Sequence, residues 1–191
     1  MTTNHYNLFK KVQLIYIIAG EAIKFFNKDK FEDQKRNGLR ICFTERGNGE
    51  DILNICVGIF PVEKSEKYFD CARKKAKLVS GENAPLTTIG NEQYTPPVPQ
   101  GGVQGYLYGV GVAGQEEEHN EVIAGAVILI IEKILFEKTD DKFKSSMIDH
   151  SASLKSLFDQ PGRNENFNKF MNYLINEQKI FQQVEFLELM E

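Results

Sequence analysis

Apolar residues near the start of the chain recur at spacings of three and four, which is typical of a helix with one buried face. The set that shares this face is Phe9, Val12, Ile15, Tyr16, Ala19, Ile23 and Phe26. The spacing predicts a helix over residues 8–27.

The pattern then changes to two short apolar runs, at residues 39–43 and 52–60. Between them stands Arg-Gly-Asn-Gly-Glu-Asp, residues 46–51. An Asn-Gly pair between two short apolar runs is a strong signal for a tight turn. We therefore predict a β-hairpin.

A second helix is predicted over residues 63–80, ending at Gly81. Its basic residues are Arg73, Lys74, Lys75 and Lys77. We expect them on a solvated face, with contact to a polar ligand or a partner as the alternative. The proline-containing segment that follows, residues 83–100, has no regular period and predicts a long, stiffened loop.

Beyond Gln100 the pattern predicts a strand over residues 106–112, a turn at Gly114 and a helix over 116–136. The most apolar part of that helix, 122–131, is too short to span a bilayer and is flanked by acids, so we expect it to be buried. Two amphipathic helices are predicted over 143–158 and 167–189. We expect a domain at 1–138, and a helical extension at 139–191 that packs on it or on another subunit.

Composition and charge narrow the possible functions. The 191 residues are 41% hydrophobic and 26% charged, and the net charge is −4. This mild acidity argues against a general nucleic-acid binder. The three cysteines form no CxxC pair and are odd in number, so we expect reduced, buried thiols. The polar start of the chain shows no secretory signal, and we expect a cytoplasmic protein without a membrane contact.

Residues 109–114, Gly-Val-Gly-Val-Ala-Gly, fit the GxGxxG pattern of dinucleotide-binding turns. The glycines fall within the predicted strand rather than after it, and the next helix begins with Glu116, Glu117 and Glu118. Carboxylates at a helix start repel the pyrophosphate that such a motif binds there. We therefore interpret the glycines as positions that let a neighbouring helix or chain approach the strand.

A larger pattern includes Gly101-Gly102-Val103, residues 111–114, His119-Asn120-Glu121, and an Ala-x-x-x-Ala stretch with Lys75 at residues 72–76. It resembles the haem-degrading/HbpS-like family, which includes the GlcG proteins and the C-terminal domain of PduO-type adenosyltransferases. The resemblance implies an α+β, profilin-like fold, with helices packed on a central antiparallel sheet. It also implies homo-oligomers, and haem or a corrinoid as possible ligands. Ala113 stands where the family has a serine, and His119-Asn120 replaces Gln-Asp.

The candidate ligand-binding residues are Gly101, Gly102, Val103, Gly114, Glu118 and His119. A neutral histidine could ligate a metal or haem iron, or move a proton, and the alternative is an exposed histidine at a helix start. The glutamates of this helix start could supply oxygen ligands, but stabilisation of the helix end is the simpler explanation, and we predict no metal site.

These observations favour a small-molecule or haem-type binding protein of the HbpS/GlcG-like class. The alternative is a structural or protein-interaction module that assembles through its C-terminal helices. A third possibility is a small enzyme that uses His119 with Glu118 or Glu121 as an acid/base pair. The sequence leaves open whether the protein is an enzyme, and it contains no P-loop, HExxH or EF-hand pattern.

Overall fold

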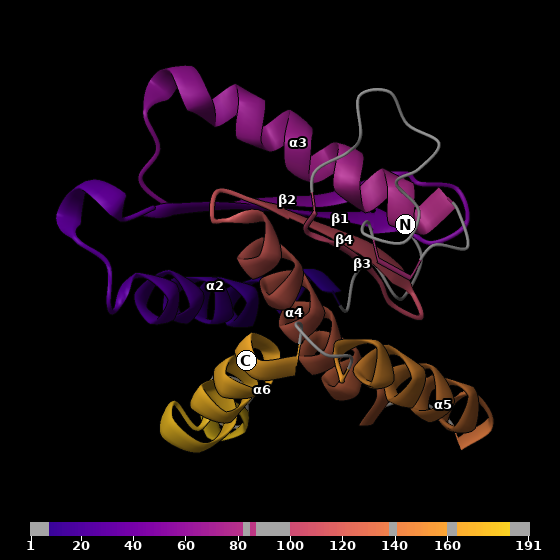
Figure 1. Ribbon diagram of the computed structural model, residues 1–191. Helices are drawn as coiled ribbons and strands as arrows, with labels where there is room; N and C mark the ends of the chain where they lie inside the picture. The colour runs from indigo at the N-terminus through magenta and orange to yellow at the C-terminus, as the bar shows by residue number, and fades with distance from the viewer. Residues whose placement is uncertain (1–7, 82–84, 87–99, 138–140, 160–163, 184–191) are drawn as a thin grey trace.

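A four-stranded antiparallel sheet with strand order β2-β1-β4-β3 organises the structure, which is a computed structural model (Figure 1). The structure describes residues 8–81, 85–86, 100–137, 141–159 and 164–183. The strands are β1 (Gly38–Glu45), β2 (Asp51–Gly58), β3 (Gly102–Gln104) and β4 (Tyr108–Ala113). The sheet and the helices packed on it confirm the α+β class, while the profilin-like arrangement stays a prediction.

The predicted hairpin is confirmed, because β1 and β2 pair antiparallel from Gly38 opposite Gly58 to Thr44 opposite Asp51. The predicted strand over 106–112 corresponds to β4, which pairs with β1 on one side and β3 on the other. The short strand β3 was not predicted, because three residues are too few to show an alternating pattern. The predicted loop at 83–100 lies almost wholly outside the described residues.

The helices are α2 (Val12–Asn27), α3 (Val62–Gly81), α4 (Glu117–Glu137), α5 (Asp141–Phe158) and α6 (Asn164–Asn172), with a short 3-10 turn η1 (Glu32–Gln34). The helix predicted over 167–189 is wrong in its extent. α6 passes into a π-helical turn, η3 (Tyr173–Glu177), and the chain then bends at Lys179, whose φ is 48°. Part of that prediction, residues 184–189, lies outside the described residues.

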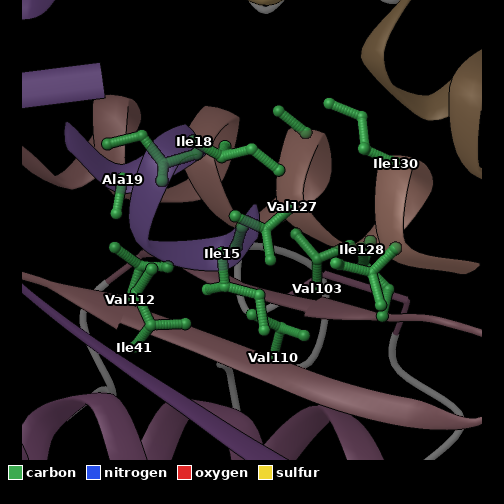
Figure 2. Close-up of a cluster of buried hydrophobic side chains, with 14 of the residues drawn as sticks. Ile15, Ile18, Ala19, Ile41, Val103, Val110, Val112, Val127, Ile128 and Ile130 are labelled. Carbon is green, nitrogen blue, oxygen red and sulfur yellow. The ribbon is translucent and has the colours of Figure 1, made fainter. Parts of the chain in front are cut away.

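The helices form layers on both sides of the sheet. α3 covers one face, α2 and α4 cover the other, and α5 and α6 lie beyond α4 (Figure 1). Between the sheet and the α2–α4 layer lies the main core, which includes Ile15, Ile18, Val110, Val112 and Val127 (Figure 2). Residues 122–128, together with Ile130 and Ile131, are buried, as predicted for the apolar half of α4. Among the described residues, no helix combines the length and apolarity of a bilayer span.

The alternating glycines of β4 explain how α3 reaches the sheet. Val110 and Val112 face the main core, so Gly109 and Gly111 face α3. A Cβ at Gly109 would lie 2.5 Å from the Ala76 carbonyl oxygen, and one at Gly111 would lie 2.5 Å from the Ala76 nitrogen. These distances are far shorter than van der Waals contact, so only glycine fits. The interpretation of Gly109 and Gly111 as positions that let a neighbouring helix approach the strand is confirmed.

Replacing Gly111 by alanine should therefore destabilise the fold. We expect Gly111→Ala to lower the free energy of unfolding by about 3 kcal/mol, because the new methyl group must push α3 away from β4. The matched control is Gly20→Ala in α2, where a Cβ meets nothing within 4 Å. The control should raise stability by roughly 0.5–1 kcal/mol through helix propensity. Urea unfolding of the three proteins tests this, and equal stability would refute the packing role.

A buried carboxylate fixes the turn between β3 and β4. Glu132, on α4, is 1% exposed and accepts hydrogen bonds from the backbone N–H groups of Tyr106 (2.9 Å) and Leu107 (2.8 Å). Burial raises the pKa of Glu132 to about 7, although these hydrogen bonds oppose the increase. The carboxyl group thus joins the middle of α4 to the β3–β4 turn.

This pKa predicts a specific pH dependence of stability. The pKa of Glu132 is higher in the folded chain than in the unfolded chain, so its contribution to stability is complete below pH ~4.5 and is lost as pH rises through about 7. Glu132→Gln removes the titration. Between pH 5 and 8, the wild type should lose up to about 3 kcal/mol relative to the variant. Urea unfolding at both pH values measures the difference, and parallel pH profiles would contradict the raised pKa.

The C-terminal helices pack on α4. The Phe158 ring stacks on Phe167 with 4.2 Å between centroids, and a Cβ at Gly125 of α4 would lie 2.6 Å from Phe158 Cε2. Phe170 and Leu174 are fully buried in the main core cluster. Phe158, Phe167, Phe170 and Leu174 are therefore covered by the same chain, and a contact with another subunit stays a prediction.

Candidate functional site

The structure brings Gly101, just before β3, next to the start of α4. The φ of Gly101 is 124°, which favours glycine, and a Cβ there would lie 2.6 Å from Asn120 Cβ and 3.0 Å from Lys75 Nζ. Asn120 directly follows His119, so the two halves of the predicted site are adjacent. Gly101, Gly102 and Val103 are nevertheless buried, and the space beside Gly101 is filled by side chains of this chain.

Gly114, which follows β4, has a φ of 126° and packs against the start of β1, where a Cβ would collide with the Gly38 carbonyl oxygen. The turn after it is held by Asn120, whose side chain accepts a hydrogen bond from the Gln115 N–H and donates one to the Gln115 carbonyl, both 3.0 Å. These contacts give the glycines a packing role. Ligand contact through them stays a prediction.

His119 lies against α2 rather than in open solvent. Its ring stacks on Phe26, the centroids 4.2 Å apart and the planes 21° apart, and its side chain is 12% exposed. Glu116 and Glu118 approach it, with Nδ1 3.5 Å from Glu116 Oε2 and Nε2 3.7 Å from Glu118 Oε1. The alternative of an exposed histidine at a helix start is therefore wrong. His119 joins the start of α4 to the end of α2.

Burial lowers the pKa of His119, although Glu116 and Glu118 act in the opposite direction. The ligand atoms of Glu116, Glu118 and His119 lie within 4.8 Å of one another, a spacing that could hold a metal ion. A cation would first have to displace Lys30, whose Nζ lies 2.7 Å from Glu116 Oε1. Acid at a helix start paired with a lysine is also common without a metal, so we propose no metal site here.

The environment of His119 predicts its titration. Its NMR midpoint should lie below the ordinary value of about 6.5, and Glu116→Gln should lower it further, because Glu116 is the largest influence that raises it. Glu117→Gln, on the same helix turn, should leave the midpoint unchanged. Since the folded pKa is depressed, the contribution of His119 to stability should be lost as pH falls below about 6.5. A midpoint above 6.5 would contradict the buried stack.

Lys75 on α3 is a buried cation that sequence patterning placed wrongly. It is 1% exposed, and its Nζ donates a 2.8 Å hydrogen bond to the Val112 carbonyl oxygen, so the prediction of a solvated face fails at this position. The prediction of a solvated face is confirmed for Lys74, which is exposed. Arg73 and Lys77 reach Asp51 of β2 with ion-pair distances of 2.5 and 3.7 Å.

Burial lowers the pKa of Lys75, opposed by nearby Cys71, Glu117 and Glu121. A buried amine of lowered pKa can act as a nucleophile when a substrate reaches it. This amine is enclosed between α3, β4 and Gly101, so we assign it a structural role: it binds the Val112 carbonyl and neutralises acids of α4.

A cavity of about 430 Å³ lies between α4, α5 and the end of α6 with the segment that follows it, away from all the residues predicted as the site. On α4 it is lined by Leu129, Ile130, Lys133 and Phe136. On α5 it is lined by Ile148, Ser151, Ala152 and Lys155. The last wall is formed by Met171, Ile175 and Phe181. Ile130 points from α4 away from the sheet, in contrast to Val127 and Ile128 (Figure 2).

Sequence reasoning missed this cavity because its walls come from three helices whose relative placement is set only by folding. One signal was present. The α5 residues that line it, from Ile148 to Lys155, recur at helical spacing.

No protein-family model, curated protein or solved structure matches this chain. The resemblance to the HbpS/GlcG-like family therefore stays a prediction. The function has to be inferred from the chemistry of the described residues. The cavity that they form has the size of a small-molecule site.

Proposed function

We propose that the protein binds an apolar small molecule in the cavity between α4, α5 and the end of α6 with the segment that follows it. The observation that supports this most is the cavity itself, because about 430 Å³ with mostly apolar walls is typical of small-molecule sites. Ile148 and Ile175, 65% and 38% exposed, line its walls. Covering such side chains with a ligand is favourable by roughly 25 cal/mol per Å² of apolar surface removed from water.

The proposal keeps the predicted class, a small-molecule binding protein, but moves the ligand away from His119. His119 lies in the first turn of α4, whereas the lining of the cavity begins at Leu129. Ten residues of helix separate them by about 15 Å, so His119 would not touch a ligand in the cavity. If haem were the ligand, Met171 would be the soft donor that the described lining residues offer.

The alternative function, assembly through the C-terminal helices, has less support. Phe158 of α5 and Phe167 and Phe170 of α6 are buried: Phe158 stacks on Phe167, and Phe170 packs against Phe25 and Phe26 of α2. These side chains are therefore not offered to a partner. Among the described residues of α5, Ile148 is the large apolar side chain that remains exposed, and it lines the cavity.

Filling the cavity should abolish binding. We expect the neutral apolar dye N-phenyl-1-naphthylamine to bind the wild type, and Ala152→Phe to weaken that binding at least roughly ten-fold, since the new ring occupies the site. The matched control is Ser153→Phe, which adds the same ring to an exposed neighbour that does not line the cavity. Dye fluorescence titrations measure both affinities.

Equal weakening by the two variants, or no dye binding at all, would refute the cavity as the ligand site. A haem titration adds a second discrimination. A Soret shift that His119→Ala abolishes and Ala152→Phe leaves unchanged would place the ligand at the start of α4 instead, as the family resemblance implies.

A further inference from the structure

We infer that the ligand of this cavity is a single-chain amphiphile with a carboxylate head, such as a medium- or long-chain fatty acid. This inference rests on the proposed function and adds the chemical class of the ligand. It comes from the two charged residues of the cavity lining, Lys133 on α4 and Lys155 on α5. Both are cations, and the described lining contains no acid.

The lysines lie where the apolar walls meet solvent. Both side chains belong to exposed residues, so their ammonium groups remain hydrated while their methylene stems line the cavity. The Lys133 ammonium lies 4.2 Å from the centroid of the Phe181 ring, which also lines the cavity. Each of the helices α4 and α5 therefore contributes one cation to an otherwise apolar or hydroxyl-bearing surface.

Neither lysine is neutralised by the described chain. No carboxylate of the described residues lies within ion-pair distance of Lys133 or Lys155, whereas Lys24, Lys30, Lys35, Lys77 and Lys169 all have such a partner. The whole chain is acidic, with a net charge of −4. The cavity therefore differs from the acidic chain as a whole, because two cations without a carboxylate partner lie beside its apolar walls. These cations complement an anionic head group on an apolar chain.

A free amphiphile fits this surface better than a membrane does. The apolar side chains line a hollow between helices rather than a flat or projecting face, and a hollow encloses a single acyl chain better than it meets a bilayer surface. A chain of net charge −4 is also repelled by an anionic bilayer. A molecule that leaves the bilayer and places its acyl chain between the helices satisfies both the apolar walls and the lysines.

The test compares acids and alcohols of equal chain length. Decanoate, dodecanoate and tetradecanoate, and the three matching alcohols, are titrated against the dye-loaded protein at pH 8 and low salt, below their micelle concentrations. Affinity should rise about four-fold per added methylene in both series, because each methylene leaves water. The acids should bind about ten-fold more tightly than the alcohols, because of the two lysines.

Lys133→Gln combined with Lys155→Gln should reduce the affinity of dodecanoate to that of dodecanol and leave dodecanol unchanged. The matched control is Lys64→Gln combined with Lys67→Gln. These two residues are exposed on α3, on the other face of the sheet, and the control makes the same change in net charge. The control should bind both ligands as the wild type does.

The outcomes separate the two proposals. If neither series displaces the dye, the proposed function fails. If acids and alcohols bind equally, or the control lowers dodecanoate affinity as much as the cavity variant does, apolar binding stands and the carboxylate inference is overturned. Dodecyl phosphate binding much more tightly than dodecanoate would overturn the carboxylate in favour of a phosphate head. Binding only to vesicles of anionic phospholipid would overturn the free amphiphile.

Discussion

The close approach of α3 to β4 is the contact on which the rest of the structure depends. Gly109 and Gly111 let the backbone of α3 lie almost directly on the strand, beside a small cluster of Cys42, Ala72 and Ala76. Such a thin layer holds few apolar atoms, so most of the burial must come from the opposite face. That face carries the β-branched residues of β1 and β4, and α2 and α4 pack there.

α4 connects the two parts of the molecule because it is buried on almost every side. Toward the sheet it presents Val127 and Ile128, and Glu132 binds the β3–β4 turn. Away from the sheet, Gly125 receives the ring of Phe158, and Ile130 lines the cavity. A helix that is apolar all round is typical of a position between two layers. The C-terminal helices thus complete the burial of α4 and, with it, form the cavity.

The charged groups at the start of α4 differ from those beside the cavity in whether they have partners within the chain. At the start of α4, Glu116 pairs with Lys30 and approaches His119, whose ring stacks on Phe26 of α2, and the enclosed Lys75 binds a strand carbonyl. These groups have internal partners, which suits a structural role. Lys133 and Lys155 lie at the opposite end of α4 and on α5, beside an open apolar surface. The difference in partners, rather than the identity of the residues, separates charges that stabilise the fold from charges that can meet a ligand.

The sequence by itself determined the local elements and the role of the β4 glycines. These features depend on residues that are close together along the chain. Helical spacing predicts α2, the Asn-Gly turn predicts the β1–β2 hairpin, and glycine alternating with valine predicts the packing face of β4. Only the tertiary structure decided the burial of Lys75, the stacking of His119 on Phe26, the early end of α6 and the cavity. Each of these depends on which faces of distant helices meet, and that is set by packing across the whole chain, which no local pattern records.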